Sequence, residues 1–184
     1  MTTASKVTIF RILLIPVFMT VLLLEIPHAQ IIGLAIFILA SMTDLVDGYI
    51  ARRYDQTTDF GKFMDPLADK LLVTSAMLIF VQWGRMPAWA LMVVLTREFA
   101  VSGLRMMAAA TGQVIAAGTS GKIKTVVTFV SICFMLTPLH DWVLVGGLTV
   151  DPLAVAAILV TTVYSGVEYF VRNGGVLAQK PPSS

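Results

Sequence analysis

The sequence predicts an all-α membrane protein with six transmembrane helices and both termini in the cytoplasm. Three observations lead to this fold class. The chain of 184 residues is 57% hydrophobic and only 13% charged, whereas soluble domains carry about 25% charged residues. Its apolar residues fall into six stretches, each close to the ~20 residues that cross a bilayer as a helix. Its basic residues gather on one side of the membrane when these stretches are threaded back and forth.

Charged residues separate the apolar stretches, which lie at residues 7–25, 30–52, 62–83, 87–110, 122–139 and 152–172. The first stretch follows Lys6 and contains Arg11, a pattern also found in signal peptides. No small-residue cleavage site follows Leu24, so we interpret this stretch as the first span. The second and third stretches are joined by only about nine residues, which predicts antiparallel neighbouring helices.

The remaining stretches complete one membrane domain over residues 1–174, which a short polar tail over 175–184 follows. The fourth stretch carries two arginines, and the fifth opens with two lysines. The single Cys133 lies within the fifth stretch, which excludes a disulfide within the chain. The sixth is predicted from its apolar length alone.

The distribution of basic residues predicts the orientation. With both termini in the cytoplasm, Arg85 is the one basic residue on the outer side, and the other twelve of the 13 lysines and arginines lie inside. Cytoplasmic segments are enriched in lysine and arginine. The twelve are Lys6, Arg11, Arg52, Arg53, Lys62, Lys70, Arg97, Arg105, Lys122, Lys124, Arg172 and Lys180. We therefore expect an integral protein of the bacterial cytoplasmic membrane, with lipids and not nucleic acid as its partners.

Four aspartates at helical spacing are the main functional signal. Asp44, Asp47, Asp65 and Asp69 lie near the facing ends of the second and third stretches. One ionised carboxylate at the centre of a membrane helix costs roughly 2.5–3.5 kcal/mol, so four unpaired ones would cost on the order of 10–14 kcal/mol. Something must neutralise them, or they must lie near the membrane surface.

The spacing allows the aspartates to converge on one site. Asp44 and Asp47 are three residues apart, and Asp65 and Asp69 are four apart, so each pair shares a helix face. Four carboxylates without histidine or thiol suit Mg²⁺, Mn²⁺ or Ca²⁺, and two such ions would balance four charges. The other interpretation is a set of solvated acids at the membrane edge, which we favour only for acids of the connection such as Asp55.

Small and basic residues follow the first aspartate pair. Gly48 and Ala51 permit a close approach of a ligand or a backbone. Arg52 lies one turn after Gly48 on the same face. An arginine beside carboxylates and metal often binds phosphate through its forked donors, although it can also serve as a membrane anchor.

The complete motif is Asp44-x2-Asp47-Gly48-x2-Ala51-Arg52-x8-Gly61-x3-Asp65-x3-Asp69. It resembles the signature of the CDP-alcohol phosphotransferase family, whose six-span topology also agrees. The resemblance implies a site with two divalent cations, Mg²⁺ or Mn²⁺, that binds a CDP-linked alcohol and releases CMP. It implies that all four aspartates are metal ligands and that Asp69 is also the general base. It further implies that the nucleotide and its phosphates are bound by Gly48, Ala51, Arg52 and Gly61. Members of the family often form homodimers.

A second motif narrows the acceptor. The stretches Arg97-Glu98-x2-Val101-Ser102-Gly103-Leu104-Arg105 and Gly121-Lys122-x-Lys124-Thr125 resemble the branch of the family that uses sn-glycerol 3-phosphate. The implied reaction transfers the phosphatidyl group of CDP-diacylglycerol to the 1-hydroxyl of glycerol 3-phosphate. Arg97 and Arg105 lie on roughly one helix face, and Lys122 and Lys124 lie on the same side of the membrane. These four cations suit a dianionic phosphate.

Other interpretations of these residues stay open. The two lysines can be membrane anchors, and Arg97 can form an internal ion pair with Glu98. The first stretch departs from the family pattern, because Ser5 occupies a position that is often asparagine, so we assign Ser5 no role. An alternative acceptor, such as phosphatidylglycerol or an inositol phosphate, is possible within the family. A divalent-cation transporter is a less favoured class, because the acids cluster on one side of the membrane.

Overall fold

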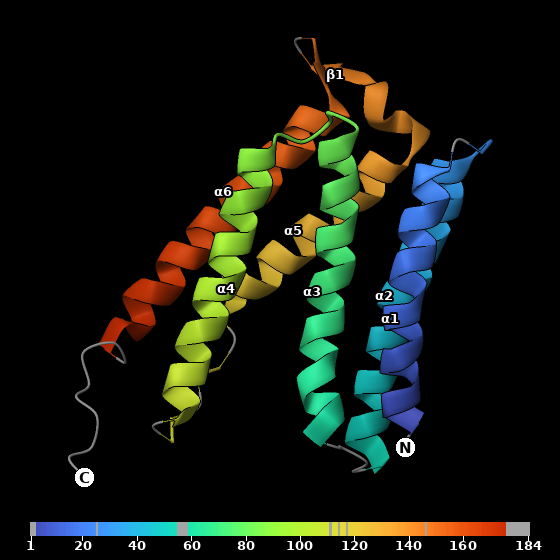
Figure 1. The fold of residues 1–184 in the computed structure, drawn as a ribbon. Coiled ribbons are helices and arrows are strands. Elements are labelled where there is room, and N and C mark those ends of the chain that lie inside the picture. The colour runs from blue at the N-terminus through green and yellow to red at the C-terminus, as the bar shows by residue number, and fades with distance from the viewer. Residues whose placement is uncertain are drawn as a thin grey trace.

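The computed structural model is a bundle of six long helices (Figure 1). It describes the backbone of residues 3–24, 26–54, 59–110, 112–113, 115–116, 118–145 and 147–175. It describes the side chains of residues 9–24, 26–43, 67–109, 112–113, 115–116, 118–143 and 147–175. The tail predicted at 175–184 therefore lies almost wholly outside the described residues, and the division into domain and tail stays a prediction.

The predicted helices are confirmed, each within four residues of its expected limits. They are α1 (Thr3–Leu23), α2 (Ala29–Tyr54), α3 (Asp59–Gln82), α4 (Ala88–Ala110), α5 (Thr119–Leu136) and α6 (Val150–Asn173). Between α5 and α6 the chain forms a 3₁₀ helix, η1 (Pro138–Asp141), and a small antiparallel hairpin of β1 (Val143–Val145) and β2 (Leu148–Thr149). The sequence analysis did not predict this hairpin.

Two helices meet the requirements for crossing a membrane unaided. Among the described residues, α5 and α6 are long and apolar enough to span a bilayer. Shorter apolar segments lie in α1 (Ile9–Leu23) and α2 (Ala29–Thr43). These features support a membrane protein, and the number of spanning helices stays a prediction.

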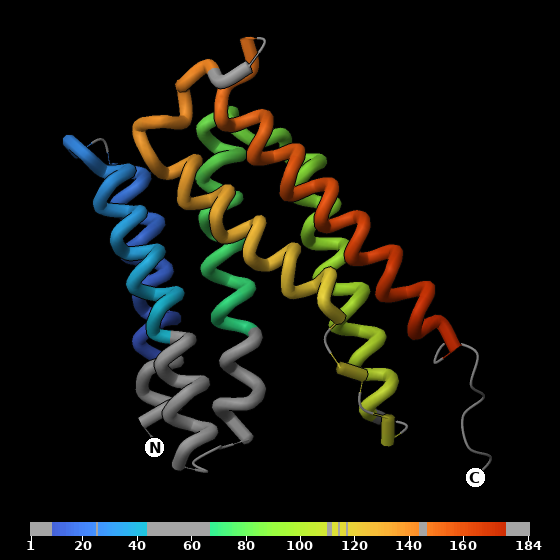
Figure 2. The backbone as a smooth tube through the Cα atoms, turned by 180° about the vertical axis from the view of Figure 1, so that it is seen from behind, coloured from blue at the N-terminus to red at the C-terminus, as the bar shows by residue number. Residues whose placement is uncertain are grey.

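The helices form two groups of three. α1 packs against α2 and α3, and α6 packs against α4 and α5 (Figures 1 and 2). α1 begins and α6 ends at the same end of the bundle, which we call the open end. The opposite end, which carries η1 and the β-hairpin, we call the hairpin end. The two groups lie closest together at the hairpin end and separate towards the open end.

The hydrophobic core occupies the half of the bundle nearer the hairpin end. The fully buried Phe18, Phe37, Phe80, Ile132 and Ile158 come from α1, α2, α3, α5 and α6. The rings of Phe18 and Phe37 have centroids 6.0 Å apart. Packed aromatic pairs at such distances add to the stabilisation from burial. This core joins the two groups of helices and leaves their other halves free to diverge.

A tight turn orients the one basic residue predicted on the outer side. α3 ends where Gly84 adopts a φ of 70°, a conformation that glycine adopts without steric cost. The backbone N–H groups of Arg85 and Met86 both donate to the carbonyl of Phe80, at 2.9 and 3.1 Å. The turn therefore directs Arg85 back over the bundle.

Arg85 forms a half-buried ion pair with the first turn of α6. Its Nε and Nη2 lie 2.7 and 2.8 Å from the two carboxylate oxygens of Asp151, and Nη2 also donates to the carbonyl of Met135. The guanidinium carbon lies 5.5 Å from the ring centroids of both Phe80 and Trp83. The pair connects the α3–α4 turn to α6 and neutralises the basic residue that the predicted orientation places outside.

We expect Asp151→Asn to destabilise the bundle, because it leaves the half-buried guanidinium of Arg85 without a counter-charge. Removal of one partner of a buried ion pair costs about 3–5 kcal/mol. Thermal unfolding in detergent micelles measures the effect. The matched control is Glu168→Gln, which removes an ion pair to Arg172, whose side chain is 69% exposed, and should cost less than about 1 kcal/mol. Equal shifts for both variants would contradict a stabilising role for the Arg85–Asp151 pair.

Candidate active site

The predicted metal site lies at the open end, where α2 ends and α3 begins. The helical backbone continues through both halves of the aspartate motif. The spacing therefore keeps Asp44 with Asp47, and Asp65 with Asp69, on one helix face each. α2 and α3 contact each other, as their short connection predicted. Hard divalent cations prefer oxygen ligands such as carboxylates, and the metal site expected at this motif stays a prediction.

Most side chains of this motif lie outside the described residues. They are Asp44, Asp47, Gly48, Ala51, Arg52, Gly61 and Asp65. Asp69 is described and is half-buried in α3. The roles predicted for these eight residues therefore stay predictions.

The residue after Asp69 links α3 to α4. Lys70 is half-buried, and its ammonium group donates to the hydroxyl of Ser102 on α4. The two residues are 32 positions apart in the sequence. This contact fixes the helix that carries Asp69 against the helix that carries the predicted acceptor arginines.

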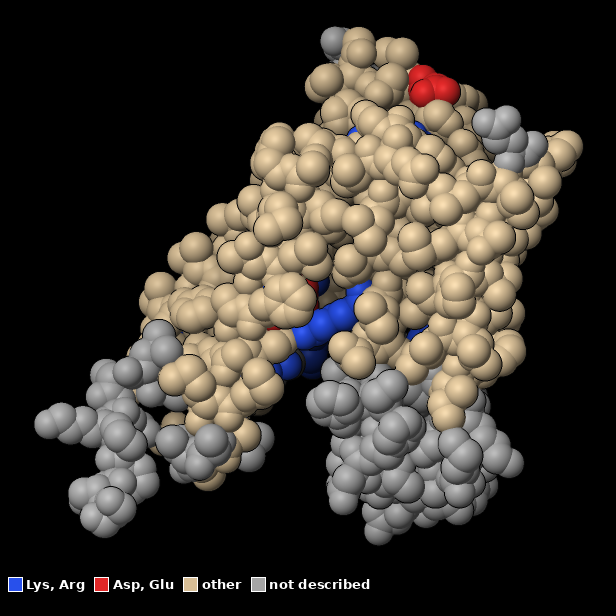
Figure 3. Space-filling view, in the orientation of Figure 1, with Lys and Arg blue, Asp and Glu red and all other residues tan. Residues whose placement is uncertain are grey.

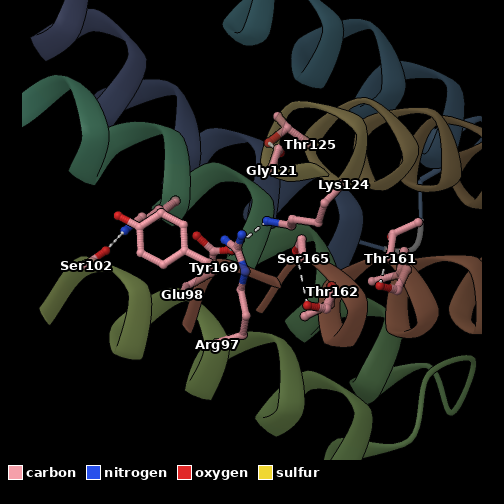
Figure 4. A network of polar contacts seen from close by, with 12 residues as sticks. Arg97, Glu98, Ser102, Gly121, Lys124, Thr125, Thr161, Thr162, Ser165 and Tyr169 are labelled. Atoms are coloured by element: carbon pink, nitrogen blue, oxygen red, sulfur yellow. Dashed lines mark hydrogen bonds and ion pairs between the residues drawn. The ribbon is translucent and has the colours of Figure 1, made fainter. Parts of the chain in front are cut away.

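Glu98 joins two of the predicted acceptor cations (Figure 4). Its Oε1 lies 2.9 Å from Nη1 of Arg97 and 2.6 Å from Nζ of Lys124. The exposed fractions of the three side chains are only 18% for Glu98, 13% for Arg97 and 9% for Lys124. The ion pair between Arg97 and Glu98, one of the two interpretations left open by the sequence, is present. Lys124 on α5 adds a second pair that the sequence analysis did not predict.

Two glycines make room for Arg97 between α5 and α6. A Cβ atom on Gly166 would lie 3.1 Å from Cγ of Arg97, and one on Gly121 would lie 3.7 Å from its Nη2. The first distance is shorter than an ordinary carbon–carbon contact. The small residues on α5 and α6 therefore let the backbone pack closely around the arginine side chain.

Arg105 lies further along α4, towards the open end. Its Nε donates to the hydroxyl of Tyr169 on α6 at 3.1 Å, and its guanidinium carbon lies 5.5 Å from the centroid of the same ring. The side chain remains exposed. Arg97 and Arg105 thus both face α6, one through Gly166 and the other through Tyr169.

Lys122 and Lys124 occupy different surroundings. Lys124 is buried beside Glu98, whereas Lys122 is exposed. Residues two apart on a helix leave it about 200° apart, so they do not share a face. The structure therefore brings Arg97 and Lys124 together, places Arg105 two turns along α4, and leaves Lys122 outside the group around Glu98.

The basic residues line a hollow between the two groups of helices. Figure 3 shows lysine and arginine side chains within this hollow, which opens towards the open end. Among the described residues, α3, α4 and α5 contribute Lys70, Arg97 and Lys124 as half-buried or buried cations. Such a concentration of positive charge at low exposure favours an anionic ligand.

Sequence reasoning missed several residues of this region. Lys70 directly follows the aspartate motif, and Ser102 lies within the second motif, but neither gave a separate signal. Tyr169 lies in a stretch that was predicted from its apolar length alone. Arg11, which the orientation argument used only as a charge, is fully buried in α1. A charged residue inside an apolar stretch is the signal that could have marked it.

Comparison with known proteins assigns the family. A model of the CDP-alcohol phosphatidyltransferase family matches residues 1–168. The chain is 45% identical to the CDP-diacylglycerol–glycerol-3-phosphate 3-phosphatidyltransferase of Bacillus subtilis, over 92% of this chain and 93% of that protein. It is 38% identical to a probable phosphatidylglycerophosphate synthase of Mycobacterium tuberculosis, over 92% of this chain and 80% of that protein. It is 36% identical to the CDP-diacylglycerol–glycerol-3-phosphate 3-phosphatidyltransferase of Salmonella paratyphi A, over 94% of this chain and 95% of that protein.

The chain belongs to the CDP-alcohol phosphatidyltransferase family. It is therefore a transferase of phospholipid synthesis, and the family predicted from its aspartate motif is confirmed.

We expect Gly166→Ala to lower stability, because the added Cβ presses on Cγ of Arg97. Overpacking typically costs about 1–3 kcal/mol, which exceeds the gain of roughly 0.5–1 kcal/mol from replacing a helical glycine by alanine. The control is Gly103→Ala on α4, where the new Cβ meets no atom within 4 Å. Thermal unfolding should therefore show a lower midpoint for Gly166→Ala and a higher one for Gly103→Ala. A higher midpoint for both would show that Arg97 adjusts freely.

Proposed function

We propose that this enzyme transfers the phosphatidyl group of CDP-diacylglycerol to the 1-hydroxyl of sn-glycerol 3-phosphate. The products are phosphatidylglycerophosphate and CMP. The observation that carries the proposal is the cluster of Arg97, Lys124 and Glu98, which lies beside the helix that bears Asp69. The names of the relatives with 36–45% identity support the same acceptor.

The aspartate motif supplies the metal-binding part of the site. Asp44, Asp47, Asp65 and Asp69 would hold two divalent cations, Mg²⁺ or Mn²⁺. When bound, these ions neutralise the diphosphate of the nucleotide and the charge that develops during transfer. Arg52 lies on the same helix as the first two aspartates and would contact a phosphate of the CDP group. The residues Gly48, Ala51 and Gly61 would allow that group to approach the backbone closely.

Asp69 is the proposed general base. It accepts the proton of the acceptor's 1-hydroxyl while that oxygen bonds to the phosphorus that carries diacylglycerol. The bond between this phosphorus and the CMP oxygen breaks, and CMP leaves with the electron pair. A carboxylate is a weak base, so the reaction depends on its placement beside the hydroxyl. The contact of Lys70 with Ser102 supports that placement, because it fixes α3 against α4.

The acceptor phosphate would bind to cations of α4 and α5. Arg97 and Lys124 already lie together around one carboxylate oxygen, and Arg105 is held over Tyr169 two turns away. Arginine and lysine bind phosphate through charge-assisted hydrogen bonds. Lys122, being exposed, would attract the acceptor at the entrance and not hold it.

The proposed topology has six transmembrane helices with the open end at the cytoplasmic surface. The apolar α5 and α6 support it, as does the concentration of basic residues among the segments of the open end. Glycerol 3-phosphate would then enter from the cytoplasm. The homodimer known from the family stays an expectation.

The first test supplies the purified enzyme with labelled CDP-diacylglycerol and one acceptor at a time. We expect label in phosphatidylglycerophosphate with glycerol 3-phosphate and little transfer to free glycerol, because glycerol lacks the phosphate that the cations bind.

Excess EDTA should stop transfer, and Mg²⁺ or Mn²⁺ should restore it. Asp44→Asn should abolish it. Preferred transfer to phosphatidylglycerol or inositol phosphate would favour the alternative acceptors, and Mn²⁺ uptake into liposomes without transfer would favour a transporter.

The second test concerns the acceptor phosphate. We expect Arg105→Ala to raise the KM for glycerol 3-phosphate roughly 10- to 100-fold, since a hydrogen bond to a charged group is worth about 1.5–3 kcal/mol. The KM for CDP-diacylglycerol should change less than about twofold. The control is Arg172→Ala at the same end of the bundle, whose side chain is 69% exposed and paired with Glu168. An unchanged acceptor KM in Arg105→Ala would remove Arg105 from the phosphate site.

A further inference from the structure

A carboxylate lies at the centre of the cations proposed to bind the acceptor phosphate. Glu98 is only 18% exposed, and its charge lies within hydrogen-bond distance of both Arg97 and Lys124. A negative charge so close to a dianionic phosphate opposes its binding. Glu98 neutralises part of the charge of Arg97 and Lys124 when no ligand is bound. The carboxylate also lies where a ligand bound to these cations would contact it.

The hydrogen bonds of Glu98 leave one of its oxygens available. Arg97 and Lys124 both contact Oε1. No hydrogen bond joins Oε2 to another described residue, and the Glu98 side chain keeps 18% of its surface exposed. An ionised carboxylate only accepts hydrogen bonds. Oε2 can therefore receive a hydroxyl group of a ligand but not a carbonyl oxygen.

The position of Glu98 on α4 matches the middle of the acceptor. Ser102 lies one turn, roughly 5.4 Å, further along the helix, and it holds Lys70, the neighbour of Asp69. Arg97 and Lys124 lie on the other side of the Glu98 carboxylate. A ligand that extends from Arg97 and Lys124 towards Ser102 therefore runs along the Glu98 carboxylate.

We propose that Glu98 is a specificity-determining residue that accepts a hydrogen bond from the 2-hydroxyl of the acceptor through Oε2. Oε1 meanwhile holds Arg97 and Lys124 in position for the phosphate. The inference rests on the proposed function, since it takes glycerol 3-phosphate as the acceptor. The site then selects a polyol phosphate against two analogues. One is 3-hydroxypropyl phosphate, which lacks the 2-hydroxyl, and the other is dihydroxyacetone phosphate, which presents a carbonyl oxygen to the carboxylate.

The experiment measures kcat/KM for glycerol 3-phosphate and for both analogues with the wild-type enzyme and variants. A site built to bind a hydroxyl rejects analogues that lack it strongly, so we expect the wild type to prefer glycerol 3-phosphate at least about 100-fold. Glu98→Gln retains the shape of the side chain and offers an amide donor. It should reduce the preference over dihydroxyacetone phosphate about 10-fold or more, because the amide can donate to the carbonyl.

The ratio of two kcat/KM values from one preparation does not depend on the fraction of folded enzyme, so a purely structural role of Glu98 would leave it unchanged. Glu98→Asp is the second variant. Its shorter side chain keeps the charge but moves the carboxylate oxygens away from the ligand, so it should also reduce the preference for glycerol 3-phosphate. Glu168→Gln on α6 is the matched control and should keep the wild-type ratio.

Two results overturn the inference while the proposed function stands. One is a wild type that uses 3-hydroxypropyl phosphate within twofold of glycerol 3-phosphate. The other is a pair of Glu98 variants that lose activity but keep the wild-type ratios. A wild type that transfers to another alcohol and not to glycerol 3-phosphate overturns the proposed function, and the inference with it.

Discussion

A charge between closely packed apolar helices must be neutralised by a partner or a ligand, and the polar contacts of this bundle follow from that constraint. At the hairpin end Arg85 is neutralised by Asp151, which ties the α3–α4 turn to α6. Towards the open end Glu98 neutralises part of the charge of Arg97 and Lys124. In the first pair the charges balance, and both carboxylate oxygens bind the guanidinium. The second group keeps an excess of positive charge, which a phosphate can satisfy.

The two ends of the bundle therefore have different functions. The aromatic and aliphatic core joins both groups of helices near the hairpin end. Towards the open end the same helices diverge, and a smaller cluster of Val101, Leu104 and Tyr169 joins α4 to α6, beside polar contacts. Lys70 and Ser102 connect α3 to α4, while Arg105 and Tyr169 connect α4 to α6. A rigid half thus supports a half that can admit water-soluble and lipid substrates.

α4 is the central element of the proposed site. Glu98, Ser102 and Arg105 follow one another at spacings of four and three, so they lie on one helix face. Each contacts a different helix: Lys124 of α5, Lys70 of α3 and Tyr169 of α6. A single helix therefore sets the distances between the aspartate motif and the acceptor cations. Because packed helices move as rigid bodies, small changes at this face should alter acceptor binding and transfer together.

The sequence alone determined the six helices, the shared helix faces of the aspartate pairs and the family, because these depend on local hydrophobicity and on spacing along the chain. It could not determine which charges meet. Lys122 and Lys124 looked equivalent, yet the structure buries only Lys124. Glu98 pairs with Lys124, which is 26 positions away in the sequence, and Arg85 pairs with Asp151, which is 66 positions away. Such contacts depend on how each helix is rotated about its axis and against which neighbour it packs, and only the tertiary structure sets both.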